Sequence, residues 1–339
     1  TRVAMQEIEE DTLAAFLSQF RTAPQGFRPE TLSERLGLGI EELDALRERL
    51  RSDGFVFETD EEGRWSLSEA PDRLFPYWIR AGLRCDRLGG QVYYKEEVVS
   101  TQDIAFELMV EGRAHGTLVL AEHQSGGRGR GENVWYSTPG KSLQFSLLLD
   151  LEPPDTFASV LTIAIATAVA RAIQDVAGLP ARIKFPNDIL VRGQKVAGIL
   201  LEVKDYGVPT RRAVAGVGIN VNQLRDELPE DVRAIATTLR EEVPDHEPIR
   251  RSRLLRYMLR ELEQSLDRIA QADFTALEDA WNRFSPMEGK EVTLTKGAEK
   301  FEGRILEANI REGLLVRLAD GSRERIRLEH ITDLNVPNA

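Results

Sequence analysis

The chain has 339 residues, a length that suits two or three domains better than one small core. Apolar residues make up 42% and charged residues 29%, so the composition excludes a disordered, collagen-like or low-complexity protein. The single cysteine, Cys85, excludes an internal disulfide, and four scattered histidines leave no cysteine and histidine cluster for structural zinc. The formal net charge of −12 at pH 7 argues against a general affinity for nucleic acid.

Residues 1–70 have the pattern of three helices followed by a hairpin. Apolar side chains recur at helical spacing from Leu13 to Phe20 and again from Leu43 to Leu50, and a Pro-Glu-Thr helix start lies between these runs. Two short strands then flank an Asp-Glu-Glu-Gly turn. This order predicts a winged helix-turn-helix, in a segment whose eight basic and sixteen acidic residues give it a net charge of −8.

The middle of the chain alternates strands with helices, after a linker expected at residues 71–92. The uncharged run at 156–170 is shorter than the ~20 residues of a bilayer span, so it favours a buried core helix. We therefore predict an α/β domain over residues 93–285. Its strands are expected at residues 117–121, 143–149, 189–191, 196–203 and 213–221, and its helices at 160–173, 249–271 and 274–284.

After Pro286 the pattern changes to short alternating runs separated by glycine turns. Such runs suit a small five-stranded barrel over residues 286–339. The strands are expected at residues 291–294, 301–309, 313–318 and 324–328.

The beginning of the chain carries acidic residues such as Glu7 and Glu9 instead of a basic stretch followed by an apolar one. We therefore expect no secretory signal and no membrane span. The low cysteine content suits a reducing compartment, so the expected location is the cytoplasm.

A glycine-rich loop, QSGGRGRGENVW at residues 124–135, directly follows an apolar strand. Its glycines let a backbone approach a ligand closely, and the forked guanidinium groups of Arg128 and Arg130 suit phosphate oxygens. It is neither a Walker loop nor a dinucleotide fingerprint, because it lacks their closing residues and spacing. The sequence predicts an anion-binding loop; the alternative is a flexible, solvated loop, which its position between apolar strands disfavours.

Two further segments have unusual residues. Lys184 lies between apolar neighbours just before Pro186, where an ammonium group suits a facing carboxylate or phosphate; a surface lysine is the alternative. The run GVGINVN at residues 216–222 is an apolar strand interrupted by glycines, which indicates close approach of a ligand or another backbone.

Taken in order, GRGRGENVW, KFPNDI, KVAGILLE and GVGINVN resemble the biotin protein ligases, and the likeness extends over residues 95–335. Trp281 and the small C-terminal barrel also match, and the N-terminal segment resembles the bifunctional bacterial type that also represses transcription. The resemblance implies a catalytic domain of the class II aminoacyl-tRNA synthetase and biotin ligase type, with a mixed sheet and a C-terminal SH3-like β-barrel.

The resemblance also implies a two-step reaction. Biotin and MgATP give biotinyl-5′-AMP and pyrophosphate, and a lysine of a biotin carboxyl carrier protein then takes the biotin and releases AMP. ATP and biotin are thus the expected substrates, Mg²⁺ the expected metal ion, and a homodimer paired through the central sheet is plausible.

Carried over residue by residue, the resemblance implies roles for several side chains. Gln102 stands where the family has asparagine, which moves its amide by one methylene, while Glu132 and Asn133 stand where a glycine and a third arginine are usual. Asp188 is the candidate for holding Mg²⁺, with a turn-stabilising role as the alternative. The implied catalytic residues are Lys184, Arg128 and Arg130; the biotin-binding residues are Ser100, Thr101, Gln102, Gln124, Arg128, Gly129, Arg130 and Lys184; the adenylate-binding residues are Gly127, Arg128, Gly129, Arg130, Trp135, Lys184, Asn187, Gly218 and Asn220.

Two rival functions are open to this sequence. A lipoate or octanoyl ligase shares the expected fold, but the Ser-Thr-Gln stretch, the arginine loop and the C-terminal barrel argue against it. A non-catalytic, biotin-sensing regulator is disfavoured by the intact lysine and arginines. The expected recognition helix begins with Ile40, Glu41 and Glu42, so we expect weak or absent binding to operator DNA.

Overall fold

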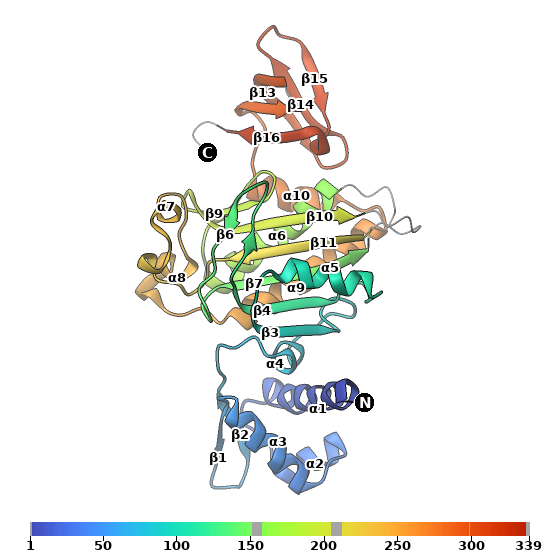
Figure 1. Ribbon diagram of the computed structural model, residues 1–339, viewed down its shortest axis with the longest axis vertical. Coiled ribbons are helices and arrows are strands. Elements are labelled where there is room, and N and C mark those ends of the chain that lie inside the picture. Colours follow the sequence, from blue (N-terminus) through green and yellow to red (C-terminus); the bar gives the residue numbers. More distant parts are fainter. Residues whose placement is uncertain (1, 151–157, 205–211, 298, 337–339) are drawn as a thin grey trace. The chain divides into compact units, whose positions relative to one another are not determined.

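The computed structural model describes residues 2–150, 158–204, 212–297 and 299–336 (Figure 1). The chain divides into two compact units, Thr1–Arg84 with Arg250–Ser252 and Cys85–Ile249 with Arg253–Ala339. Each unit is described by itself.

The first unit contains the three helices and the hairpin that the sequence predicts. A shared core of apolar side chains, among them Phe16, Leu43 and Trp65, holds them together. A fourth helix lies within the stretch expected to be a linker; its Tyr77 and Trp78 are buried in the same core, and the Tyr77 hydroxyl donates to Asp53 at 2.7 Å. The elements are α1 (Arg2–Thr22), α2 (Pro29–Leu36), α3 (Ile40–Ser52), β1 (Val56–Thr59), β2 (Trp65–Glu69) and α4 (Pro76–Arg80).

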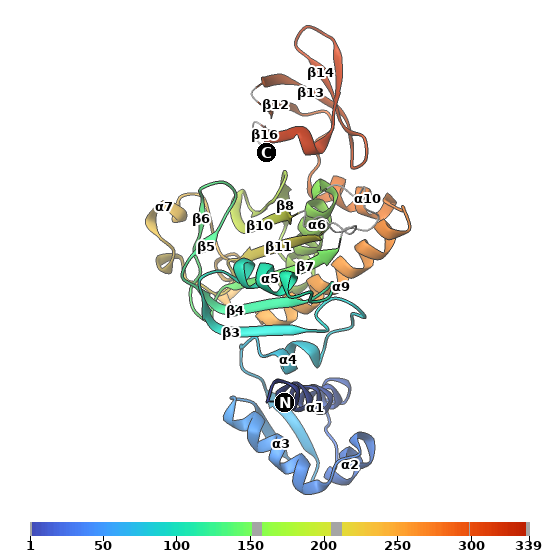
Figure 2. The same ribbon diagram turned by 45° about the vertical axis from the view of Figure 1, so that its right-hand side comes forward.

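A mixed seven-stranded sheet forms the centre of the second unit, in the order β3-β4-β7-β11-β10-β9-β8 (Figure 2). Only β3 and β4 are parallel; the other neighbouring pairs are antiparallel. This confirms the mixed sheet. The strands are β3 (Val92–Val98), β4 (Leu118–Gln124), β7 (Leu143–Asp150), β8 (Ala181–Lys184), β9 (Asp188–Val191), β10 (Gln194–Lys204) and β11 (Arg212–Ile219), and a separate hairpin is formed by β5 (Gly127–Arg128) and β6 (Val134–Trp135).

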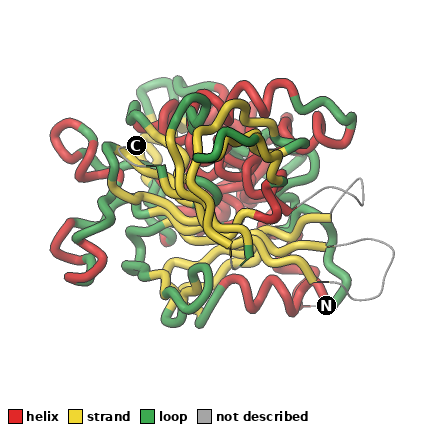
Figure 3. Tube along the Cα trace, turned by 90° about the horizontal axis from the view of Figure 1, so that it is seen from above, coloured by secondary structure: helices red, strands yellow, loops and turns green. Residues whose placement is uncertain are grey.

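Helices cover both faces of this sheet (Figure 3). Helix α5 packs against β4, β7 and β11 through side chains such as Phe106 and Met109, while α6 packs against β8, β9 and β10. The helices are α5 (Thr101–Val110), α6 (Ala158–Ala177), α7 (Glu230–Arg233), α8 (Leu239–Glu242), α9 (Arg251–Ala270) and α10 (Thr275–Phe284), with 3-10 turns η1 (Arg225–Glu227), η2 (Pro244–His246) and η3 (Leu328–His330).

Helix α6 contains most of the uncharged run at 156–170, and its side chains from Val160 to Ile173 are nearly all buried. By length and composition it is the one described helix that could cross a membrane, yet 67% of the relevant stretch is buried inside the protein. The predicted core helix is confirmed. It ends before Gly178, whose φ of 69° is the left-handed conformation that commonly closes a helix.

The second unit ends in a five-stranded antiparallel sheet of order β15-β14-β13-β12-β16. Its buried side chains, such as Leu294, Ile305 and Val316, alternate with exposed ones along the strands. The strands are β12 (Glu291–Lys296), β13 (Glu299–Asn309), β14 (Gly313–Leu318), β15 (Arg323–Ile326) and β16 (Ile331–Asn335).

Candidate active site

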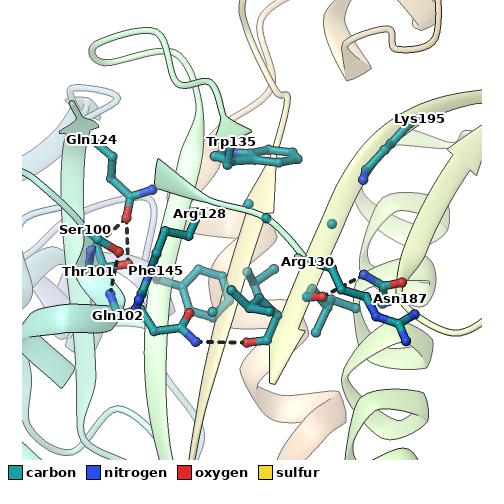
Figure 4. Close-up of a pocket in the computed structure, with 17 residues that line it drawn as sticks. Ser100, Thr101, Gln102, Gln124, Arg128, Arg130, Trp135, Phe145, Asn187 and Lys195 are labelled. Carbon is teal, nitrogen blue, oxygen red and sulfur yellow. Dashed lines mark hydrogen bonds between the residues drawn. The ribbon is translucent and has the colours of Figure 1, made fainter. Parts of the chain in front are cut away.

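A narrow cavity opens where the start of α5, the glycine-rich loop and strands β10 and β11 meet (Figure 4). Its free volume is only about 50 Å³, because side chains of the loop and of α5 lie over the strands. The cavity is lined by Ser100, Thr101, Gln102, Gln124, Arg128, Gly129, Arg130, Trp135, Phe145, Asn187, Lys195, Gly198, Ile199, Leu200, Gly216, Val217 and Gly218. Most of the residues that the resemblance implies are thus brought together.

Side-chain amides are held in fixed orientations at one end of the cavity. Gln124 Oε1 accepts hydrogen bonds from the Thr101 backbone N–H at 2.7 Å and the Thr101 hydroxyl at 2.9 Å, so its Nε2 is left to donate. Gln102 Nε2 donates to Glu202 at 2.6 Å, so its Oε1 is left to accept. Ser100 caps α5 by accepting from the Gln102 N–H at 3.2 Å and retains its own hydroxyl proton. This end therefore offers donors and an acceptor to one ligand.

Glycines on β11 make room for two of these side chains. A Cβ placed on Gly216 would lie 2.0 Å from Gln102 Oε1, and one placed on Gly218 would lie 2.2 Å from the Trp135 ring. Trp135 Nε1 is buried without a hydrogen-bond partner among the described atoms. The indole thus lies flat on the strand with a donor available to a ligand, and any side chain at these two positions would displace it or the Gln102 amide.

The glycine-rich loop is a β5–β6 hairpin that carries the arginines over the cavity. Arg128 contacts two carboxylates, Asp103 at 2.9 Å and Glu202 at 3.4 Å, while Arg130 has no ion pair among the described residues. Asn133, which replaces the arginine of the family pattern, donates from Nδ2 to the Arg130 carbonyl at 2.8 Å and closes the hairpin. The loop therefore presents one partly neutralised and one free guanidinium group.

The lysine of the cavity is Lys195, and this corrects the prediction for Lys184. Lys184 ends β8 with an exposed side chain that lines a different cavity, because alternation along that edge strand turns it outward. Lys195 on β10 reaches over the Trp135 ring, 6.0 Å from its centroid, and contacts Asp188 at 2.6 Å. The sequence has this residue at the start of KVAGILLE, three residues before Gly198 in the same strand, and that position was the available signal.

Of three other predicted adenylate-binding residues, one lines the cavity and two do not. Asn187 lines the cavity and donates from Nδ2 to the Ile199 carbonyl at 3.0 Å. Asn220 is buried and does not line the cavity; its Nδ2 donates to the Thr237 carbonyl at 3.1 Å. Gly127 is paired with Trp135 in the hairpin and permits that close approach without lining the cavity.

No group of three His, Cys, Asp or Glu side chains that could hold a metal ion occurs in the part of the chain that the structure describes. Asp188 stands beside Lys195 as a single carboxylate. A single carboxylate suits Mg²⁺ that arrives with phosphate groups and keeps its waters, and it does not suit a metal held by the protein alone.

An amide-lined pocket that continues into a lysine, arginine and indole surface suits an enzyme that joins an acid to a nucleotide. A model of the biotin/lipoate A/B protein ligase family matches residues 95–220. The bifunctional ligase/repressor BirA of Bacillus spizizenii is 31% identical over 295 residues, which cover 87% of this chain and 90% of that protein. The chain belongs to this family, among its biotin protein ligases.

Other similar proteins are also biotin ligases. The biotin--[acetyl-CoA-carboxylase] ligase of Mycobacterium tuberculosis is 31% identical over 202 residues, covering 57% of this chain and 72% of that protein. Among solved structures, the Aquifex aeolicus biotin protein ligase in complex with biotin and ATP is 27% identical with a TM-score of 0.62, covering 73% of this chain and 99% of that one.

Proposed function

We propose that this chain is a biotin protein ligase, which activates biotin with ATP to biotinyl-5′-AMP and transfers the biotin to a lysine of an acceptor protein. The main support for this function is that one cavity is lined both by oriented amides and by Lys195, Arg128 and Arg130. A cyclic urea has one carbonyl and two N–H groups, and the amide-lined end offers donors and an acceptor of the matching kinds. The dithiolane ring of lipoate has neither, so the amides favour biotin over lipoate.

The cationic side chains of the cavity act in the first step, the formation of biotinyl-5′-AMP. A biotin carboxylate oxygen attacks the α-phosphorus of ATP, a new P–O bond forms, and the bond to the departing pyrophosphate breaks. Because both reactants are anions, Lys195, Arg128 and Arg130 offset their repulsion and stabilise the charge that develops on the α-phosphate. Trp135 and Gly218 form the surface against which the adenine packs, with Asn187 at its edge. Asp188 is the residue that would reach Mg²⁺, which when bound neutralises phosphate charge.

In the second step an unprotonated lysine amine of the acceptor attacks the acyl carbon of biotinyl-AMP. The amide bond forms, AMP leaves with the electron pair of the acyl–oxygen bond, and the amine gives up a proton. No nucleophile of this chain is needed for either step, since the adenylate is already an activated acyl group. A biotin carboxyl carrier protein is the proposed acceptor, and the cytoplasm is the proposed location.

The helices and hairpin of residues 1–70 form the proposed winged helix-turn-helix, and the C-terminal sheet over residues 286–339 forms the proposed SH3-like barrel. The names of the Bacillus and Escherichia coli relatives, bifunctional ligase/repressor BirA, make DNA-dependent repression a second candidate function, which the net charge of −8 on residues 1–70 disfavours. A homodimer is also consistent with the family, and gel filtration with and without biotin and ATP would measure it.

One assay tests the ligase proposal. The full chain is incubated with biotin, MgATP and a purified carboxyl carrier domain, and intact mass spectrometry is expected to find one added biotinyl group on a single lysine. Pyrophosphate release should require biotin and ATP. An acceptor that gains lipoate and no biotin under matched conditions would instead establish the rival ligase, and absence of any pyrophosphate would establish a sensor without catalysis.

A further inference from the structure

A second cavity, of about 320 Å³, lies within the second unit, apart from the proposed active site. It is bounded by the edge strand β8, the end of α10 and the edge strand β16. Its volume falls within the range of small-molecule sites, whereas the active-site cavity is nearly filled by its own side chains. The two cavities share no lining residue, although Phe185 of this one and Asn187 of the other belong to the same β8–β9 turn.

The charged residues around this second cavity are all basic. Arg182, Lys184 and Lys290 line it, and no aspartate or glutamate does. None of the three pairs with a carboxylate in the part of the chain that the structure describes, although many other lysines and arginines do. In a chain with a net charge of −12, three unpaired cations around one hollow create a local positive potential that attracts an anion.

The interior of the cavity is apolar. Phe185, Phe284 and Met287 line it, and each is at least 94% buried. Leu334 of β16 closes the opposite side. Large apolar side chains beneath a basic rim give the contrast typical of a site for an amphipathic ligand, because the apolar part of the ligand leaves water while its charge stays at the rim.

We propose that this cavity binds a small organic anion with an apolar body, of the size of a medium-chain or aromatic carboxylate. The carboxylate contacts Lys184 and Lys290, and the apolar body lies against Phe185 and Met287. Lys184, which the sequence placed at the active site, thus belongs to a separate binding site. This inference concerns a cavity that takes no part in biotin activation.

The test uses the fluorescent anion 8-anilinonaphthalene-1-sulfonate, which combines an apolar body with one negative charge. The full chain is titrated with the probe, and one saturable site is expected. Octanoate should displace the probe, whereas octylammonium, with the same chain and the opposite charge, should not. Equal displacement by the two would show that charge plays no part, and this result would overturn the proposal.

Variants locate the site. Lys184→Met and Lys290→Met should each weaken probe binding about tenfold, the loss expected for one charge-assisted contact. Lys300→Met is the matched control, because Lys300 is an exposed lysine of the C-terminal sheet that does not line the cavity. Its affinity should equal that of the unaltered chain. Circular dichroism checks that each variant is folded, and equal affinity in all three folded variants would overturn the proposal.

Biotinamide, which keeps the ureido ring of biotin and has no carboxylate, distinguishes the two cavities. Saturating biotinamide should leave the probe signal unchanged, because the proposed biotin site shares no residue with the second cavity. Displacement of the probe by biotinamide would place the probe at the active site and contradict the inference. Failure of the ligase assay would leave the probe result intact, so the two proposals fail independently.

Discussion

Two glycines of β11 lie beneath different side chains of the cavity. Gly216 lies beneath the Gln102 amide and Gly218 beneath the Trp135 indole, two residues apart on one face of the strand. The same one-methyl addition at either position would therefore displace a different side chain. This allows the biotin and nucleotide contacts to be separated by a matched pair of variants.

We expect Gly216→Ala to raise the KM for biotin and Gly218→Ala to raise the KM for ATP, each about tenfold or more, since the added methyl would disrupt the ligand-facing amide or indole. Pyrophosphate release measured against each substrate in turn checks the pattern. Each variant is the control for the other. Equal effects of both variants on both substrates would contradict this division of the cavity.

Lys195 and Lys184 line different cavities, so the same substitution should affect adenylate formation differently. Lys195→Met should lower kcat/KM for adenylate formation about 100-fold, because removing a cation that faces developing negative charge typically costs that much. Lys184→Met should have an effect at least about tenfold smaller, since Lys184 lines the other cavity. Steady-state pyrophosphate release compares them. A larger loss in the Lys184 variant would restore the prediction made from sequence.

The sequence identified the motifs, but side-chain direction decides which residue of a motif reaches the ligand. Gln102, Gln124, Arg128 and Trp135, which the sequence predicts to bind biotin or the adenylate, line one cavity. Lys184 was misplaced because its strand, β8, is only four residues long and was not predicted, so its alternation could not be used. Asn220 follows the glycine strand in sequence, yet its amide turns inward to Thr237.

The burial of a strand explains whether it could be predicted from the sequence. Strand β7 is buried along nearly its whole length and therefore appears as an uncharged, mostly apolar run before Asp150. Strand β3 contains Lys95, Glu96 and Glu97 on a half-exposed edge, so it has no such run. The fifth strand of the C-terminal sheet, β16, is also an edge strand with exposed polar residues, and the sequence expected a fifth strand without locating it.

Glu263 on α9 binds the backbone of residues 86–88, at the start of the second unit. Its carboxylate accepts backbone N–H groups from Asp86 at 2.7 Å and Leu88 at 2.9 Å, and from Arg87 at 3.3 Å. Burial of the side chain raises its pKa, but these hydrogen bonds to the charged form outweigh burial and hold the pKa of Glu263 below its usual value. Nearby, burial and this carboxylate raise the pKa of the Cys85 thiol to about 12, which keeps the thiol protonated at neutral pH.

Glu263→Gln should lower the free energy of unfolding by about 1–3 kcal/mol at pH 7, since an amide nitrogen would face backbone donors. A carboxyl whose folded pKa is lowered stabilises the fold above its unfolded pKa, and this contribution is lost as the pH falls through the folded pKa. The difference between the two proteins in urea midpoint should therefore shrink below about pH 4.5. Asp267→Asn, which removes an exposed ion pair with Arg87, is the control and should cost less than about 1 kcal/mol. A difference that stays constant down to pH 3 would contradict the assignment.

The net charge of the chain is distributed unevenly along the sequence. Residues 1–70 carry −8 of the net charge of −12, although their fold is the one proposed to bind DNA. The arginines of α3 do not compensate, because each contacts an acid of the same helical segment: Arg47 with Asp44 at 2.8 Å, Arg49 with Asp53 at 3.5 Å, and Arg51 with Glu48 at 2.6 Å. Arg47 also lies over the Trp65 ring, 3.8 Å from its centroid. A phosphate would have to compete with each of these contacts.

We therefore expect the full chain, with biotin and MgATP, to form no sequence-specific complex tighter than about 10⁻⁸ M with promoter DNA of biotin-synthesis genes at about 0.15 M salt. Mobility shifts over a range of salt concentrations measure this. The double variant Asp44→Asn with Glu48→Gln releases Arg47 and Arg51, so its affinity for DNA should rise and become more dependent on salt. A tight, specific complex of the unaltered chain would instead show that the acidic helix face is no barrier, and would establish repression as a second function beside ligation.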